Sequence, residues 1–115
     1  MSVYEGRRRA NGIEVTVDGR PLDARLDLRV FSESGFEWGY EGGGPAQLAL
    51  AILAHHFGDD VRAMTHYKDF RSAVIAGLTG DTWRLEGDII DGALGSVTVV
   101  PMTLEQLFDK VRGKA

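Results

Sequence analysis

Side chains that can bind metal ions gather in one short stretch of the sequence. The stretch contains His55, His56, Asp59, Asp60 and His66. Adjacent residues on a helix point about 100° apart, so His55 and His56 cannot easily share an ion. A site formed by His55, Asp59 and His66 requires a second helix to fold back on the first, and the HExxH zinc motif is absent. The structural alternative is that histidines finish one helix and aspartates cap the next. If these side chains do bind a metal ion, the chain is a metal-dependent hydrolase, which is the second alternative function.

Just before this stretch, Gly42, Gly43 and Gly44 precede Pro45 at the expected start of a helix. Free backbone N–H groups and the helix dipole favour an anion at such a position. However, the lysine and the serine or threonine of a P-loop are missing, and Pro45 removes one donor. The structural alternative is a tight turn that leads into the helix. Small-molecule or nucleotide binding at residues 42–44 is the first alternative function.

Aromatic residues alternate ahead of the glycines. Phe36, Trp38 and Tyr40 would share one face of an extended segment, and this face is either core or a binding surface. No lysine or arginine lies between residues 35 and 55 to hold a nucleic-acid backbone. We expect Trp38 to anchor this loop against the following helix, and Tyr40 and Glu41 to face a protein partner.

Helices must position these residues. The segment 45–57 predicts a helix with Pro45 in its first position, and it is apolar nearly all round, which is typical of a buried central helix. Gly58 is expected to end it, and Asp59 or Asp60 to cap a second helix over 60–77. A short helical turn capped by Asp88 should present Ile89, Ile90 and Leu94, and a capping box at Thr103 and Gln106 predicts a last helix over 103–112.

Strands are expected mainly in the N-terminal half. Extended segments are predicted around Tyr4, over 13–17, over 24–31 and near Trp83. Residues 96–100 form either a further strand or a linker that extends over the core. Asp18-Gly19 is a hairpin turn signal, and Pro21 limits the returning strand to a short pairing. Leu26, Leu28 and Val30 alternate on one face of the segment 24–31. The sequence therefore predicts an α+β fold, in which a sheet of three or four mostly antiparallel strands packs on the buried helix 45–57 and the helix 60–77.

The composition favours one soluble domain. The chain has 115 residues, 43% of them apolar and 26% charged, and it has no cysteine. No signal peptide or membrane-spanning segment is visible, so we expect a cytoplasmic protein. The net charge of −4 argues against nucleic-acid binding. No pattern requires a cofactor, and the serines lack the context of a catalytic nucleophile.

Several stretches of the sequence resemble a family of small uncharacterised proteins from bacteria, phages and plasmids. They are "YEGRR", "VTVDGRPL", "GFEWGYEGGGPAQLALAILAHHFGDD", "HYKDFRSAVIAGL" and "TWRLEGDII", in the order that the family has them. The resemblance covers about residues 3–94, and residues 95–115 form an extension. The family is described only as a domain of unknown function. The resemblance implies a small accessory protein of a mobile element, and some such proteins counter host defence systems.

These observations together favour a non-enzymatic protein. No group of residues in the sequence matches a catalytic arrangement, whereas the aromatic segment is suited to contact another protein. We therefore expect a single domain over 1–115 that acts by binding a host protein through Trp38, Tyr40 and Glu41.

Overall fold

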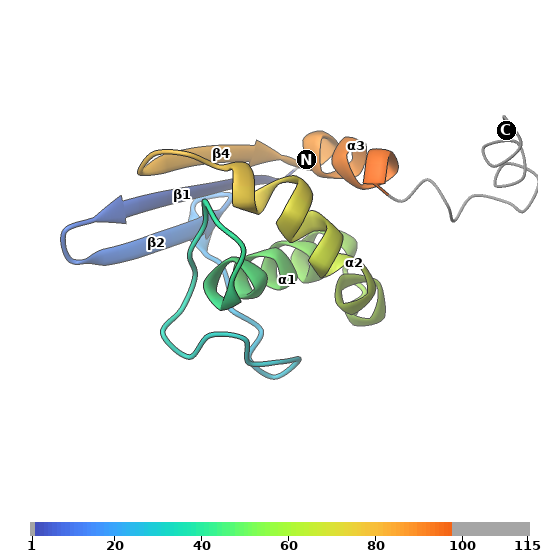
Figure 1. Cartoon of the computed structure of the whole chain (residues 1–115), viewed down its shortest axis with the longest axis horizontal. Helices are drawn as coiled ribbons and strands as arrows, with labels where there is room; N and C mark the ends of the chain where they lie inside the picture. The colour runs from blue at the N-terminus through green and yellow to red at the C-terminus, as the bar shows by residue number, and fades with distance from the viewer. Residues whose placement is uncertain (1, 98–115) are drawn as a thin grey trace, which may run out of the picture.

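A four-stranded antiparallel sheet forms one layer of the molecule. The computed structural model describes residues 2–97, with side chains for residues 2–94 (Figure 1). The strands are β1 (Val3–Arg9), β2 (Gly12–Val17), β3 (Arg20–Pro21) and β4 (Thr82–Glu86), and the sheet order is β3-β2-β1-β4. The helices are α1 (Gly43–Phe57), α2 (Asp60–Ala73) and α3 (Gly87–Val97), with a short 3-10 turn, η1 (Ile75–Gly77), after α2. The α+β prediction is confirmed.

The sheet has one buried and one exposed face. Tyr4 on β1, Val15 and Val17 on β2, and Leu85 on β4 are each at most 8% exposed. Their neighbours along the strands are exposed or half-buried, so the strands follow the period of two that a one-sided sheet requires. In Figure 1, α1 and α2 lie on the same side of the sheet. The buried face of the sheet and the two helices therefore enclose one core.

The turn between β2 and β3 forms as the sequence predicts. Asp18 and Gly19 have φ angles of 53° and 84°, the left-handed conformation that a type I′ hairpin requires at both positions. The Asp18 carboxylate also accepts a 2.9 Å hydrogen bond from the Val3 N–H. Pro21 ends β3 after two residues, which confirms that the returning strand makes only a short pairing.

Helix α1 is the centre of the core, as predicted. Every residue from Pro45 to Ala54 is buried. The helix begins at Gly43, so the prediction that Pro45 occupies its first position is wrong. The difference costs no hydrogen bond, because the first four N–H groups of any helix have no partner within it. Gly58 ends α1 with a φ of 62°, in the left-handed conformation expected of a glycine in that place.

The second helix is shorter than predicted. Asp59 caps α2 by accepting hydrogen bonds from the N–H groups of Val61 and Arg62, but α2 ends at Ala73 rather than at residue 77. Val74 departs from helical geometry at φ −124° and ψ −58°, and the chain tightens into η1, which buries Ile75 completely. The prediction ran too far because apolar residues at helical spacing, Val74 and Leu78, continue beyond the point where the chain leaves α-helical geometry.

The predicted strand over 24–31 is wrong. Leu26 and Val30 are 47% and 50% exposed, and Leu28 is half-buried. Arg25 has a φ of 54°, and its N–H donates to the Asp23 carboxylate at 2.8 Å. A left-handed residue held by a local hydrogen bond interrupts the extended backbone that a strand requires.

The region after β4 is a helix rather than a single turn. In α3, Ile90 and Leu94 are buried as expected, but Ile89 is 53% exposed. Ser96 and Val97 belong to α3, which contradicts a strand or linker over 96–100 at its first two positions. The remainder of that segment and the predicted helix 103–112 lie outside the described residues. Within the described part of the chain, no helix has the length and apolar character needed to cross a membrane.

Candidate functional site

Trp38 fixes the segment that connects β3 to α1. Its side chain is 2% exposed and packs edge-on against Trp83 of β4, with ring centroids 5.6 Å apart. Its Nε1 donates a 3.0 Å hydrogen bond to the Gly80 carbonyl. Trp38 therefore joins this segment to the sheet, whereas we expected it to anchor the segment against the following helix. The contacts fall on β4 and the chain before it.

Arg8 completes the attachment. Its guanidinium lies 4.5 Å from the centroid of the Trp38 ring and forms ion pairs with Glu37 at 2.7 Å and with Asp81 at 3.1 Å. Hydrogen bonding to Glu37 and then to Asp81 raises the pKa of Arg8 above its ordinary value. The side chain stays charged in any case, so the cation stacked on Trp38 is permanent.

The three alternating aromatics do not share one face. Trp38 is buried, Phe36 is half-buried and Tyr40 is 50% exposed. Gly39, between Trp38 and Tyr40, has a φ of 91° and donates its N–H to the Ile75 carbonyl at 3.0 Å. This left-handed residue turns the chain, so the alternation of an extended segment ends at Trp38.

Tyr40 and Glu41 lie on the surface next to this anchor. The Tyr40 ring covers Gly42, where an added Cβ would come within 2.6 Å of the ring. Glu41 accepts a 2.8 Å hydrogen bond from Nε of Arg71, near the end of α2. The loop thus carries an exposed aromatic ring next in sequence to a glutamate that is paired with α2. We refer to Tyr40, Glu41 and Arg71 as the Tyr40 surface.

The glycines before α1 allow close packing. A Cβ at Gly43 would lie 2.5 Å from the Phe31 carbonyl oxygen, and a Cβ at Gly44 would lie 2.7 Å from Cβ of Glu37. Gly42 itself adopts an extended conformation with a φ of 179° and has no side chain to cap the helix. Parts of the connecting segment therefore lie directly against residues 42–44, which agrees with the structural alternative of a tight turn.

Gln47 holds the connecting segment from inside, and the sequence reading missed it. Its side chain is completely buried on α1. Its Oε1 accepts hydrogen bonds from the N–H groups of Phe31 and Ser32, and its Nε2 donates to the carbonyls of Ala24 and Arg29. One amide therefore satisfies four backbone groups of a segment without regular structure. A single glutamine among ten buried helix residues was the only available signal.

The candidate metal ligands serve separate structural purposes. His55 Nδ1 shares a 2.7 Å hydrogen bond with the buried Tyr4 hydroxyl, Asp59 caps α2, and the His66 ring lies against Phe57. No group of three or more metal-binding side chains comes together anywhere in the described residues. The structure thus places His55, Asp59 and His66 in three different roles.

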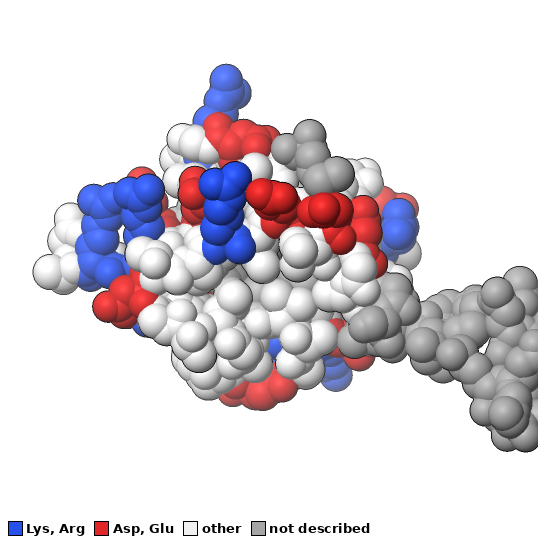
Figure 2. Space-filling view, turned by 90° about the horizontal axis from the view of Figure 1, so that it is seen from above, with Lys and Arg blue, Asp and Glu red and all other residues white. Residues whose placement is uncertain are grey.

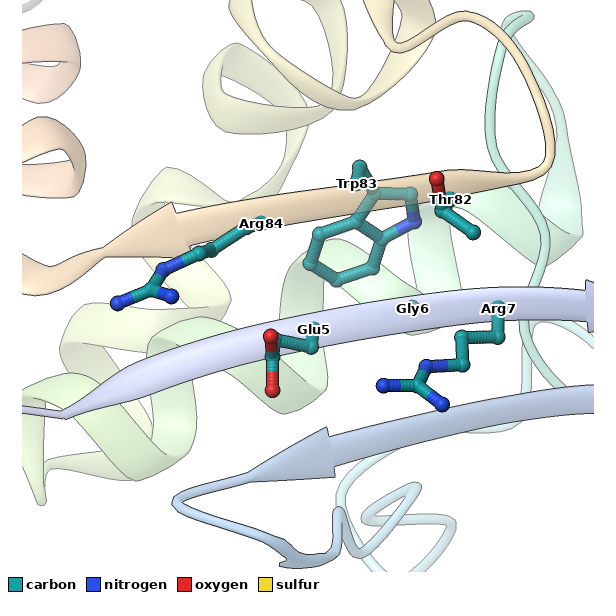
Figure 3. A pocket seen from close by; sticks show the side chains of 6 residues that line it. All are labelled: Glu5, Gly6, Arg7, Thr82, Trp83 and Arg84. Carbon is teal, nitrogen blue, oxygen red and sulfur yellow. The ribbon is translucent and has the colours of Figure 1, made fainter.

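An open hollow of about 480 Å³ lies between β1 and β4 (Figure 3). The residues that line it are Glu5, Gly6, Arg7, Thr82, Trp83 and Arg84. A Cβ at Gly6 would overlap the Trp83 indole, so the glycine makes room for that ring. Nε1 of Trp83 is buried without a hydrogen-bond partner among the described residues. Both positively and negatively charged side chains line the hollow, so its charge favours no particular class of ligand.

Comparison with known protein families gives a match over most of the described residues. A family model described as "Family of unknown function (DUF6166)" matches residues 4–96. This range agrees with the resemblance over residues 3–94 that the sequence motifs indicate. No curated protein and no solved structure matches the chain.

Proposed function

We propose that this chain, which belongs to the Family of unknown function (DUF6166), is a non-enzymatic accessory protein that binds a protein partner through the Tyr40 surface. The observation that carries the proposal is the contrast within one short loop. Trp38 is 2% exposed, whereas Tyr40, two residues later, is 50% exposed. The loop is thus anchored by one aromatic residue while it presents another to solvent.

A fixed aromatic ring is well suited to protein recognition. Tyrosine has few rotatable bonds and combines an apolar ring with a hydroxyl, so it is enriched where binding energy concentrates in interfaces. The Tyr40 ring already rests on Gly42, and Glu41 is already paired with Arg71. Since these side chains already have contacts that position them, binding of a partner restricts less of their conformational freedom.

The same connecting segment exposes further apolar side chains. Leu26 and Val30 are 47% and 50% exposed, and with Tyr40 they are three of the five large apolar side chains that are exposed in the described residues. Exposed apolar side chains that concentrate in one segment are more typical of a contact surface than of a solvated loop. This concentration supports a protein as the partner.

The charge of the chain supports the same class of partner. A net charge of −4 disfavours a phosphate backbone, and we propose no nucleic-acid role. The role in a mobile element, with a host defence protein as target, is supported by the sequence resemblance to phage and plasmid proteins. The glycine turn and the histidines are not included in the proposed site, because packing and capping contacts already occupy them.

Affinity capture with a matched variant tests the proposal. The tagged chain and its Tyr40→Ala/Glu41→Ala variant are each used to capture proteins from a bacterial lysate, after circular dichroism has shown that both are folded. We expect a specific protein to be enriched by the unmodified chain and reduced at least about tenfold by the variant, the loss typical of a central contact. Equal recovery with both chains would exclude the Tyr40 surface, and recovery of no specific protein would argue against the proposed function.

A further inference from the structure

The hydrogen-bond register of the sheet defines which backbone groups of β4 are free. The Arg8 N–H donates to the Asp81 carbonyl at 2.7 Å, and the Gly87 N–H donates to the Ser2 carbonyl at 3.1 Å. In an antiparallel pair, hydrogen-bonded residues alternate with residues whose groups point away. Trp83 and Leu85, opposite Gly6 and Tyr4, therefore direct their N–H and C=O groups towards β1.

The alternate residues of β4 direct their groups away from the sheet. They are Thr82, Arg84 and Glu86, and the side chains of all three are exposed. β4 ends the sheet order β3-β2-β1-β4, so no strand of the described chain pairs with this edge. In Figure 1, β4 is the outermost strand on its side of the molecule, and Figure 2 shows acidic and basic side chains next to one another on that side. An unpaired edge of this kind is a template for another strand.

We propose that two copies of this chain associate through antiparallel pairing of β4 with β4 about a two-fold axis at Arg84. In this register Arg84 lies opposite Arg84 of the second copy, and Thr82 lies opposite Glu86. Each residue with outward backbone groups thus meets another such residue. Because the Glu86 carbonyl accepts the first hydrogen bond of α3, the pairing allows roughly four N–H···O=C bonds between the copies. A register shifted by two residues places Glu86 opposite Gly80, whose carbonyl already accepts from Trp38 and Arg8.

The charges on the edge are self-complementary. Arg84 forms a 3.3 Å ion pair with Glu86 of its own strand, and both side chains are about half exposed, at 59% and 48%. In the paired arrangement Glu86 of one copy is the diagonal neighbour of Arg84 of the other. Two arginines and two glutamates then form one neutral cluster, which offsets the repulsion of the two arginines that face each other. This complementarity is the reason for naming a second copy as the occupant of the edge.

The pairing adds backbone bonds but little apolar area. Trp83 and Leu85 would face each other across the new interface, yet they are already only 8% and 7% exposed. Interfaces that bury so little surface are weak, so we expect dissociation in the range of about 0.1 mM. The dimer therefore forms at high local concentration, and its sheet continues across both copies.

Sedimentation of the full chain from about 10 μM to about 1 mM tests this proposal, since the range brackets the expected dissociation constant. Arg84→Pro removes the outward N–H and leaves the β1 ladder intact, because the Arg84 N–H does not point to β1. Arg84→Ala retains the N–H and is the matched control. We expect the unmodified chain and Arg84→Ala to dimerise, and Arg84→Pro to dimerise at least about tenfold more weakly. A monomer at all concentrations, or unchanged association of Arg84→Pro, would overturn the proposal.

Charge variants give an independent test, which holds if the proline variant does not fold. Arg84→Glu makes the edge acidic and Glu86→Arg makes it basic, so each variant alone should self-associate less than the unmodified chain. An equimolar mixture of the two should restore association. A mixture that associates no better than its components would contradict the pairing. Since Tyr40 and Glu41 are unchanged in every variant, these results are separate from those that test the proposed function.

Discussion

At the scale of single residues, neighbouring side chains in the connecting loop have different roles. Trp38 is buried against Trp83 and beneath Arg8, so Trp38→Ala should lower the free energy of unfolding by about 3–5 kcal/mol. Tyr40 and Glu41 are exposed, so Tyr40→Ala with Glu41→Ala should change it by less than about 1 kcal/mol. Urea denaturation of both variants measures the difference. If the double variant is destabilised as much as Trp38→Ala, the whole aromatic segment is core and the Tyr40 surface is not a binding site.

Gly6 is a second residue with one clear role, because the absence of a side chain there leaves space for the Trp83 indole. A Cβ at this position would overlap the Trp83 ring, so Gly6→Ala should destabilise the fold by about 1–3 kcal/mol. Trp83→Leu removes the ring, and in that background the cost of Gly6→Ala should fall by at least half. A double-mutant cycle of urea melts measures this coupling. Equal costs in the two backgrounds would show that Gly6 is required for another reason.

The buried hydroxyl of Tyr4 predicts a dependence of stability on alkaline pH. Burial, and then the nearby Asp18 carboxylate, raise the pKa of Tyr4 to about 12. An unfolded tyrosine titrates near about 10. The folded state therefore keeps a proton that the unfolded state loses, so the stabilisation is complete below pH 10 and is lost as the pH rises from about 10 to about 12.

Urea melts across this pH range measure the effect. We expect Tyr4 to account for about 1–2 kcal/mol of the loss in free energy of unfolding. The figure is reduced from the full shift because the hydroxyl bonds to the exposed His55 at the edge of the core, where solvent screens the charge. Tyr4→Phe has no titrating group and should lose less stability over the same range, although it also loses the hydrogen bond to His55. An equally steep loss in Tyr4→Phe would contradict the assignment.

At the scale of elements, α1 carries most of the core. Leu53 is completely buried near the C-terminal end of the run of buried residues, so Leu53→Ala should cost about 2–5 kcal/mol. Val61 on α2 is 75% exposed, and Val61→Ala is the matched control, with an expected change within about 0.5 kcal/mol. Chemical denaturation of both variants tests this contrast. A loss of less than about 1 kcal/mol for Leu53→Ala would show that α1 is not the centre of the core.

Elements with strong local signals could be predicted from the sequence. The apolar run of α1, the Asp18-Gly19 turn and the αL glycine at position 58 each express a local preference that the fold retains. Strand β4 was recognised from Trp83 and Leu85, which alternate with exposed residues. For these parts the local pattern and the tertiary structure agree, and an element of this kind can be predicted from its sequence.

The connecting segment could not be predicted, because distant residues determine its path. Its alternation of Leu26, Leu28 and Val30 suggested a strand, yet Arg25 turns the chain and its guanidinium pairs with Asp27 and Asp60. Gln47, from α1, supplies hydrogen bonds that a strand would otherwise take from a neighbouring strand. No periodicity in a single sequence reports contacts of this kind.

At the scale of the whole molecule, the core and the connecting segment have separate functions in our account. The sheet and helices form a rigid support, and the segment between β3 and α1 presents exposed apolar side chains on it. The account therefore assigns function to a surface that binds a protein, and it assigns no reaction to the chain.

Photo-crosslinking from position 40 tests this claim most directly. A photoreactive phenylalanine analogue replaces Tyr40 in one chain and Val61, which is 75% exposed and lies outside the Tyr40 surface, in a control chain. Both chains are expressed in bacterial cells, irradiated, and analysed by mass spectrometry for adducts. The account predicts a discrete adduct with one protein from position 40 and none with that protein from position 61. No adduct from position 40, or the same adduct from both positions, would contradict it.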